Sequence, residues 1–394
     1  MTTPVGTARA GTALGSRNEA TRRHNLAALM TLVHRADGLS RSELTRATGL
    51  NRSTIGALVG DLVDAGLVTE EHPETTTVGR PSPMVRPHRD VVALAINPDV
   101  DAVSLALVGL GHRVLERRRI PVAQVPSPED VARLAAEAWD AWSADLGVRC
   151  VGAGIAVPGL VRMADAVVAR APHLLWRDAP VGELVERAVA LPTAVDNDAN
   201  AGLLAEQLFG AAAGETDVIY LNGSTSGIGG AVGVGGMVLR GADGFAAELG
   251  HTLADRDGPP CHCGRRGCLE TEVNLQRLET AAGGPLEHAD LAGSLRSLAS
   301  PALEAEIDRQ ADVLARGIAN LVSAFNPRVV ILGGFLSALL SLRDEAIREQ
   351  VAAHTFAPLA DALRIESAAL VDNQVLVGAA ELAFAGLLAD PLGV

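Results

Sequence analysis

From residue 90 to the end, the sequence contains several apolar runs of strand length, each of which ends in glycine or small polar residues. Four such runs are CVGAGIAVPGLV, PTAVDNDANAG, DVIYLNGSTSGIGGAVGVGG and PRVVILGG, which begin at residues 150, 192, 217 and 327. A segment of helical composition, SPEDVARLAAEAWDAWSADLG, precedes the first of them, with Ser127 as its cap. This alternation predicts an α/β fold. Open α/β sheets bind ligands at their strand ends, where the polar residues of these units stand.

Residues 21–88 have a different pattern, which predicts a winged helix-turn-helix after a disordered tail at 1–20. Ser40 followed by Glu43 is a capping box, and it starts a short helix that ends near Gly49. Asn51 is a good N-cap for a second helix, whose apolar residues fall on one face: Ile55, Leu58, Val59, Leu62 and Val63. Two short helices followed by a hairpin are typical of DNA-binding proteins. The alternative is an ordinary three-helix bundle with a loose hairpin.

In the DNA-binding interpretation, the second helix reads the bases. Residues at the starts of the two helices can reach bases or phosphates: Arg41, Asn51, Arg52, Ser53 and Thr54. Arg80, in the GRP tip of the predicted wing, is suited to an A·T-rich minor groove. We expect double-stranded, palindromic operator DNA as the partner. A homodimer or a dimer of dimers would place two recognition helices on half-sites about one DNA turn apart.

Charge is distributed unevenly, in agreement with a basic module on an acidic body. The net charge is −14, yet the first 60 residues carry eight Arg against three acidic residues. All 33 basic residues are Arg, which excludes the phosphate-loop NTPases because their loop requires a Lys. No apolar run has the length of a signal-peptide core or a membrane span. We therefore expect a cytoplasmic protein with no membrane partner.

Three of the four cysteines lie within eight positions, in the stretch CHCGRRGC at 261–268. In a cytoplasmic protein, clustered cysteines indicate a metal rather than disulfides. His251 stands upstream and completes a Cys3His set, namely His251, Cys261, Cys263 and Cys268. Such a set suits one structural zinc per chain, with no open position for catalysis. A redox pair is the alternative, but the spacing lacks C-x-x-C.

Two further patterns supply polar side chains near strand ends. The DNDAN stretch brings Asn197, Asp198 and Asn200 into one turn, a combination that suits hydroxyl groups. The alternative is a helix start with Asx caps. Glu248 and His251 are three residues apart, which places both on one face if the segment is helical.

Together these segments resemble the ROK family of sugar kinases and sugar-responsive repressors. SGIGGAVGVGGMVLRGADGFAAELGH resembles its signature, CHCGRRGCLE its zinc loop, and AVPGLV, DNDANAG, FNPRVVILGG and VLVGAAELA match further segments in order. The winged helix resembles that of the repressor branch. The resemblance implies an actin-like body of two α/β lobes, 89–200 with 376–394 and 201–375, with a sugar between them. The sugar hydroxyls would meet Asn197, Asp198, Glu248, His251 and Glu270, and in the kinases the position of Asp198 is the general base.

Departures from the family bear on activity. Kinase members carry an Asp-x-Gly-Gly-Thr turn for ATP phosphate, and its place is taken here by Asn97, Pro98, Asp99, Val100 and Asp101. The two aspartates would repel a triphosphate, and Pro98 has no N–H to donate. Ala247, where the family has glycine, is a milder departure.

We therefore expect no enzymatic activity. The chain is predicted to be a sugar-responsive transcriptional repressor that a sugar or a sugar derivative releases from its operator. One alternative is an ATP-dependent sugar kinase with an added DNA-binding domain. Another is a regulator governed by a protein partner.

Overall fold

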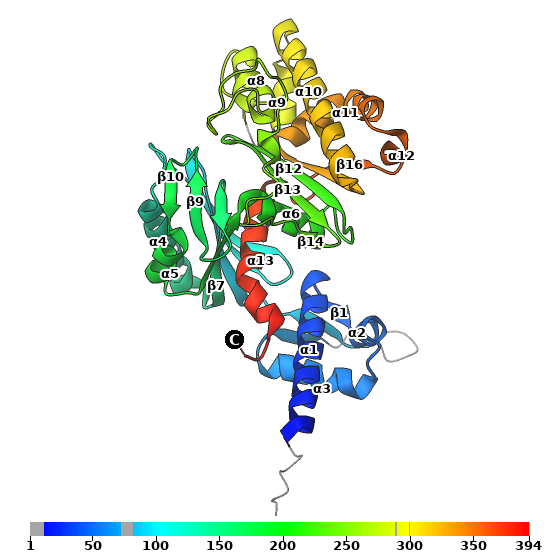
Figure 1. Cartoon of the computed structure of the whole chain (residues 1–394). Helices are drawn as coiled ribbons and strands as arrows, with labels where there is room; N and C mark the ends of the chain where they lie inside the picture. Colours follow the sequence, from blue (N-terminus) through cyan, green and yellow to red (C-terminus); the bar gives the residue numbers. More distant parts are fainter. Residues whose placement is uncertain (1–11, 72–81, 288–289, 299, 394) are drawn as a thin grey trace, which may run out of the picture. The chain divides into compact units, whose positions relative to one another are not determined.

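The computed structural model of the chain describes residues 12–71, 82–287, 290–298 and 300–393. These residues form two compact units, which we call the N-terminal unit and the body. The N-terminal unit takes in the described chain up to Val92, the turn Gly109–Arg113 and the residues from Phe384 onward; the body takes in the rest. Four elements therefore each run from one unit into the other: β4 (Val91–Pro98), β5 (Ala102–Gly109), β6 (Arg113–Pro121) and α13 (Gln374–Ala389) (Figure 1).

The N-terminal unit contains the predicted helix-turn-helix and the strands of a wing. Its elements are α1 (Thr12–Arg35), β1 (Leu39–Ser40), α2 (Arg41–Thr48), α3 (Arg52–Asp64), β2 (Val68–Glu71) and β3 (Met84–Pro87). The strands form one sheet in the order β1-β3-β2. All three helices bury apolar side chains in its core: Leu26, Leu29, Met30, Val33, Leu44, Ile55, Leu58, Val59 and Leu62. Of the five residues predicted to share one face of the second helix, four lie in this core, and Val63 is 38% exposed.

The helix ends agree with the sequence, but the first helix is longer than predicted. Ser40 and Glu43 form the expected capping box, and Gly49 ends α2 in the left-handed conformation. Helix α1 begins at Thr12, so the prediction of a disordered tail over 1–20 is wrong from that residue on. Extending an existing helix requires no new nucleus, so α1 continues past the apolar stripe that begins at Leu26.

The body contains two five-stranded sheets with the same strand order. The first is arranged β11-β7-β4-β5-β6, from β4 (Val91–Pro98), β5, β6 (Arg113–Pro121), β7 (Arg149–Val157) and β11 (Thr193–Asn197). The second is arranged β14-β13-β12-β15-β16, from β12 (Val218–Ser224), β13 (Gly227–Val234), β14 (Met237–Val238), β15 (Val329–Gly334) and β16 (Arg364–Ser367). Numbered along the chain, each sheet reads 3-2-1-4-5. The body is therefore built from two lobes of one topology.

Helices cover both faces of the second sheet, because its strands are apolar on both faces. On one face, side chains of β12 and β15 such as Leu221 and Leu332 pack in a core with four helices. These are α8 (Leu275–Ala282), α9 (Leu291–Ser297), α10 (Pro301–Phe325) and α11 (Phe335–His354). Alternate residues of the same strands, such as Tyr220 and Ile331, pack with α6 (Asp198–Phe209). Alternate side chains of a strand point to opposite faces of the sheet. When a sheet lies between two layers of helices, the side chains on both faces are expected to be buried.

The first lobe is completed by helices and a small extra sheet. The helices α4 (Pro128–Leu146) and α5 (Val181–Val189) pack together, and the extra sheet is formed by β8 (Leu160–Arg162), β9 (Val167–Ala171) and β10 (Trp176–Ala179). Helix α13 crosses β7 so closely that a Cβ at Gly154 would lie 1.8 Å from the carbonyl oxygen of Ala379. Glycine is therefore required there for the return of the chain onto the first lobe.

Two predicted boundaries differ from the structure. The predicted division between residues 200 and 201 falls inside α6, because this helix packs against strands of both sheets. The predicted first lobe included all of 376–394, but from Phe384 onward the described chain belongs to the N-terminal unit. None of the described helices has the length and apolar character needed to cross a bilayer.

Candidate functional site

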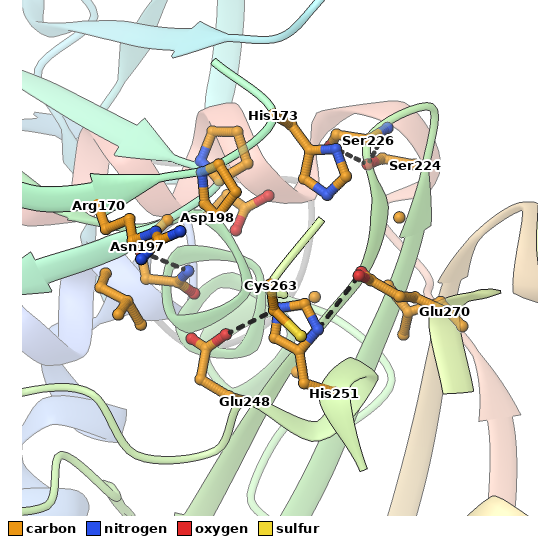
Figure 2. A pocket seen from close by; sticks show the side chains of 18 of the residues that line it. Arg170, His173, Asn197, Asp198, Ser224, Ser226, Glu248, His251, Cys263 and Glu270 are labelled. Carbon is orange, nitrogen blue, oxygen red and sulfur yellow. Dashed lines mark hydrogen bonds and ion pairs between the residues drawn. The ribbon is translucent and has the colours of Figure 1, made fainter. Parts of the chain in front are cut away.

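A cavity of about 310 Å³ lies in the body, where β7, β11 and β12 end. All five side chains that the family resemblance assigns to a sugar line it: Asn197, Asp198, Glu248, His251 and Glu270 (Figure 2). The lining also includes charged and polar residues from both lobes, namely Arg170, His173, Ser224, Ser226, Cys263 and Arg265. The expectation of a polar site at the strand ends is therefore correct in position.

Asp198 is the first residue of α6, directly after β11, and is 8% exposed. Its Oδ1 accepts a hydrogen bond from the N–H of Ala199 at 2.8 Å. Burial raises the pKa of the Asp198 carboxyl to about 7, and the charges of Asp99 and Glu248 act in the same direction. A carboxyl that titrates near neutral pH can accept a hydrogen bond from a ligand hydroxyl or remove its proton.

Asn197 lines the cavity and also caps α6. Its Oδ1 accepts from the N–H groups of Ala199 and Asn200, at 2.9 and 3.1 Å. Its Nδ2 donates to the carbonyl of Gly159 at 3.1 Å. The capping explanation of the DNDAN stretch is thus correct for this residue, while Asp198 carries the carboxylate that faces the cavity.

Glu248, His251 and Glu270 form a chain of contacts across the cavity wall. The short 3-10 helix η1 (Leu249–His251) places His251 Nε2 3.8 Å from Glu248 Oε2, so the two lie side by side as their spacing predicts. His251 Nδ1 lies 3.1 Å from Glu270 Oε1, and this hydrogen bond raises the pKa of His251. Burial raises the pKa of Glu248. Burial also raises that of Glu270, but hydrogen bonds from His251 and Cys261 outweigh it, and the pKa of Glu270 is lowered.

The predicted metal ligands converge on one point. One ligand atom from each can be chosen so that all four lie within 4.8 Å of one another: His251, Cys261, Cys263 and Cys268. Cys263 Sγ and Cys268 Sγ are 3.7 Å apart, and Cys261 Sγ is 3.6 Å from His251 Nδ1. Zinc–sulfur bonds of about 2.3 Å and zinc–nitrogen bonds of about 2.0 Å imply tetrahedral edges of about 3.6–3.8 Å. The four residues therefore fit a zinc ion. With zinc on Nδ1, His251 would no longer donate from that nitrogen to Glu270 Oε1, and it would keep Nε2 for the cavity.

Two backbone positions near the cavity have a positive φ: Gly227, which leaves room for Glu270, and Ala247, which is strained. Gly227 has a φ of 135°, and a Cβ there would lie 2.4 Å from Glu270 Oε2, so only glycine fits. Ala247, next to Glu248, has a φ of 65°. This is the left-handed region, where a Cβ is disfavoured. Ala247 is therefore a source of local strain, more than the mild effect expected from the sequence.

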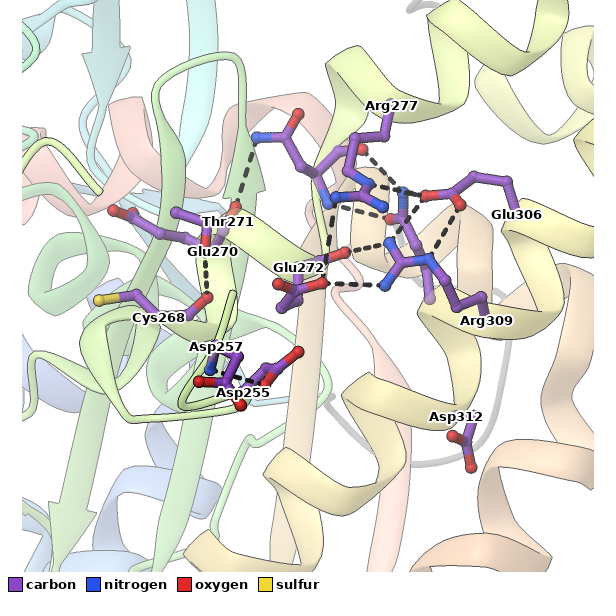
Figure 3. A network of polar contacts seen from close by, with 12 residues as sticks. Asp255, Asp257, Cys268, Glu270, Thr271, Glu272, Arg277, Glu306, Arg309 and Asp312 are labelled. Carbon is purple, nitrogen blue, oxygen red and sulfur yellow. Dashed lines mark hydrogen bonds and ion pairs between the residues drawn. The ribbon is translucent and has the colours of Figure 1, made fainter. Parts of the chain in front are cut away.

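Helix α7 (Leu269–Glu272) carries Glu270 and is held against α10 by a polar network (Figure 3). Arg309 Nη1 contacts Glu272 Oε2 at 3.1 Å, and its Nη2 donates to the Glu272 carbonyl at 2.6 Å. Asn274, just beyond α7, exchanges two hydrogen bonds of 3.0 Å with Gln310. A helix of four residues is not stable alone, so α10 determines where α7 and Glu270 lie.

The sequence analysis missed several cavity residues. Arg170 and His173 come from the segment around β9, which has no strand-end pattern of polar residues. Arg265 lies inside the cysteine loop, and its Nη2 donates to the backbone carbonyl of His251 at 2.8 Å. Its place between Cys263 and Cys268 was the available clue, because a loop that holds two metal ligands also fixes the side chains between them.

The polar side chains of residues 97–101 are held by contacts within the body. Asn97 Nδ2 donates to the carbonyl of Ala156 at 2.8 Å. Asp99 Oδ2 accepts from Thr225 Oγ1 at 3.1 Å, and burial raises the pKa of this carboxyl. Asp101 pairs with Arg119 at 2.6 Å.

The predicted DNA-contacting residues lie at the starts of α2 and α3, except Arg80, which lies outside the described residues. Arg52 and Ser53 are exposed, and Thr54 is half-buried. Asn51 Oδ1 accepts from Thr54 N at 2.9 Å and from Ser53 Oγ at 2.6 Å, so Asn51 acts as the cap of α3. Arg41 donates to Glu70 of β2 at 2.6 Å. Asn51, Arg52 and Ser53 are thus the exposed members of the described set, and Asn51 also serves as the helix cap.

Fold and site together define a class of protein: a winged helix-turn-helix domain followed by a two-lobed, actin-like body of the sugar-kinase type. Comparison with known proteins agrees. The chain belongs to the ROK family, whose sequence model matches residues 93–385, and the model of the MarR family matches residues 22–76.

Repressors and kinases are both among the relatives. A putative xylose repressor of Caldicellulosiruptor sp. (strain Rt8B.4) is 29% identical over 381 residues, which cover 91% of this chain and 94% of the relative. A glucokinase of Thermotoga maritima is 30% identical over 297 residues, which cover 71% of this chain and 93% of the kinase.

Among solved structures too, a transcriptional regulator matches more of this chain than a kinase does. A ROK family transcriptional regulator, described as a homologue of the E. coli MLC protein, matches with a TM-score of 0.74 and 25% identity over 94% of this chain and 98% of its own. A ROK glucokinase from Streptomyces griseus, solved with glucose and AMPPNP, matches with a TM-score of 0.67 and 27% identity over 75% of this chain and 100% of its own. Of these proteins, the regulators match along nearly the whole chain and the kinases match a smaller part of it.

Proposed function

We propose that this protein is a sugar-responsive transcriptional repressor, whose winged helix binds operator DNA and whose body binds a sugar. One observation carries the proposal: a single chain joins an exposed recognition-helix start, at Arg52 and Ser53, to a polar cavity at Asp198, Glu248 and His251. Similarity to a putative xylose repressor over 91% of the chain supports it. The proposed ligand contacts are those of the family resemblance, from Asn197 to Glu270.

Zinc completes the proposed sugar site. His251, Cys261, Cys263 and Cys268 would hold it, and when bound it supplies a rigid crosslink with no open position for a substrate. The chain's own residues do the rest. His251 is fixed through Nδ1 and directs Nε2 toward Glu248 and the cavity, and Arg265 holds the His251 carbonyl.

A sugar kinase is the second candidate, and Asp198 favours it. A buried carboxyl with a pKa of about 7, at the family's general-base position, suits proton removal from a sugar hydroxyl. Phosphoryl transfer also needs a triphosphate whose charge is neutralised. Here Asp99, which accepts a hydrogen bond from Thr225, places a carboxyl in the turn expected to replace the phosphate-binding turn. Pro98 in the same turn has no N–H to donate to a phosphate. We therefore infer that the site binds sugar without phosphorylating it.

Release from DNA follows from linkage between two sites. If the sugar favours one arrangement of the lobes and DNA another, each ligand weakens the binding of the other by the same factor. The chain crosses between the body and the N-terminal unit four times, within β4, β5, β6 and α13, so a change in the first lobe has covalent routes to the winged helix. A homodimer would present two copies of α3 to a palindromic operator.

Paired variants test this proposal. An operator is first selected from random duplex DNA, and DNA binding is followed by fluorescence anisotropy while sugar binding is followed by calorimetry. Above pH 7, where Asp198 is ionised, Asp198→Asn should lower sugar affinity about tenfold, because a charged acceptor becomes a neutral amide. It should also abolish release without affecting DNA affinity. Arg52→Ala should weaken DNA binding and leave sugar binding intact, whereas Arg256→Ala, an exposed arginine of the body, should change neither.

The kinase alternative has a distinct outcome. The protein with sugar, ATP and magnesium should form no sugar phosphate. Accumulation of sugar phosphate by the parent but not by Asp198→Asn would establish a kinase and contradict the argument from the altered turn.

A further inference from the structure

A second cavity, of about 530 Å³, adjoins the proposed sugar cavity in the body. Four residues line both cavities: His173, Ser226, Gly227 and Glu270. Apart from Thr225, the remaining wall of the second cavity comes from two segments of the second lobe. One is the start of the cysteine loop, with Pro259, Pro260 and His262, and the other runs from Thr271 through the first turns of α8.

The four shared residues come from both lobes, so the two cavities adjoin at the wall of the proposed sugar site. His173 comes from the first lobe and faces His262 of the cysteine loop, with ring centroids 4.6 Å apart and planes tilted by 50°. Glu270 lines both cavities, and its Oε2 lies near Gly227, where the missing Cβ leaves room. A sugar ring that contacts Glu270 in the first cavity would therefore lie beside the second cavity.

The second cavity has the chemistry of a carbohydrate subsite. Proline rings and imidazoles give it flat faces, and Thr225, Thr271, Asn274 and Gln276 give it hydroxyls and amides. Many ligand pockets combine such apolar surface with a few polar groups. A pyranose ring presents both: C–H groups on its faces and hydroxyls at its edge.

Charge argues against a phosphorylated ligand in this second cavity. Its charged lining residues are Glu270, Glu279 and Arg277, so acids outnumber the base. Arg277 Nε already donates to Glu306 Oε1 at 3.1 Å. An anionic ligand would meet two carboxylates and a single guanidinium that already donates to Glu306, so net repulsion disfavours it.

We propose that the effector is an unphosphorylated disaccharide, with one ring in the first cavity and the second ring between the cysteine loop and α8. The proposal rests on the proposed function and specifies its ligand class. Gln276, exposed at the start of α8, is the residue through which the second ring can be tested without touching the first cavity or the metal ligands.

Calorimetry with the full chain compares glucose and xylose with cellobiose, maltose and xylobiose. At least one disaccharide should bind about tenfold more tightly than the monosaccharide of which it is made. Gln276→Ala should reduce that gain, and Gln276→Trp, which fills the second cavity, should remove it while monosaccharide affinity stays unchanged. Gln350→Trp, at an exposed glutamine of α11, is the matched control and should leave both affinities unchanged.

Two outcomes would overturn this inference in different ways. If monosaccharides bind but no disaccharide binds better, or if Gln276→Trp leaves disaccharide affinity intact, the second cavity is no subsite and the proposed function stands. If none of the five sugars binds, the proposed function loses its support together with the subsite.

Discussion

Removing Arg309 should destabilise the body much more than removing a comparable arginine of the same helix. Arg309 joins α10 to the end of α7 through Glu272, whose side chain is only 9% exposed, and through Glu306. In Arg309→Met the stem still packs, but Glu272 loses a charge-assisted hydrogen bond to its carboxylate and another to its backbone carbonyl. The nearest remaining cation is Arg277, at 4.0 Å from Glu272.

The size of the effect follows from burial. A hydrogen bond to a charged group contributes about 1.5–3 kcal/mol, and breaking a fully buried ion pair costs about 3–5 kcal/mol. Arg309 is 32% exposed and Arg277 compensates in part, so the buried-pair figure is an upper bound. We expect Arg309→Met to lower the free energy of unfolding of the body by about 2–3 kcal/mol. Glu272→Gln in the same chain should restore part of this loss, because it removes the buried charge.

Urea denaturation followed by circular dichroism measures the change. Arg316→Met is the matched control: this arginine lies on the same helix and pairs with Asp312, but both side chains are nearly half exposed. An exposed pair contributes about 0–1 kcal/mol, so its loss should be small. Equal losses for the two variants, or no recovery with Glu272→Gln, would refute the argument that α10 holds α7 through a buried carboxylate.

Two further predictions concern the metal loop and the strained turn. Protein purified without added metal should contain about one zinc per chain by elemental analysis, and Cys263→Ser should lose it; a parent protein that is free of zinc would contradict the proposed site. Ala247→Gly should raise the free energy of unfolding by about 0.5–1 kcal/mol, because Ala247 has a φ of 65°. Ala246→Gly is the control and should lower the free energy of unfolding, because Ala246 is not among the positive-φ residues. A lower free energy of unfolding in both variants would mean that the methyl group of Ala247 contributes more through packing than its backbone loses through strain.

Much of this protein could be predicted from its sequence, because the decisive interactions are local. The ends of α2 and α3 depend on Ser40, Glu43, Gly49 and Asn51, which act on the backbone within one turn of themselves. Strand-then-turn units predict an α/β body, since periodicity and turn residues act over a few positions. The metal ligands lie in one short loop with one histidine upstream, so their spacing alone predicts the set that the structure brings together.

Other features were decided by contacts between distant segments. His173 reaches the cavity because the first lobe brings it against His262, 89 positions later in the chain, and nothing near either residue predicts that meeting. Arg309 determines where Glu270 lies, although 39 positions separate them, because a four-residue helix needs a partner to hold it. Ala247 is strained only because the surrounding fold requires a left-handed turn. Local sequence sets which elements form, but a side chain's partners depend on where separate elements pack, and that is a property of the whole fold.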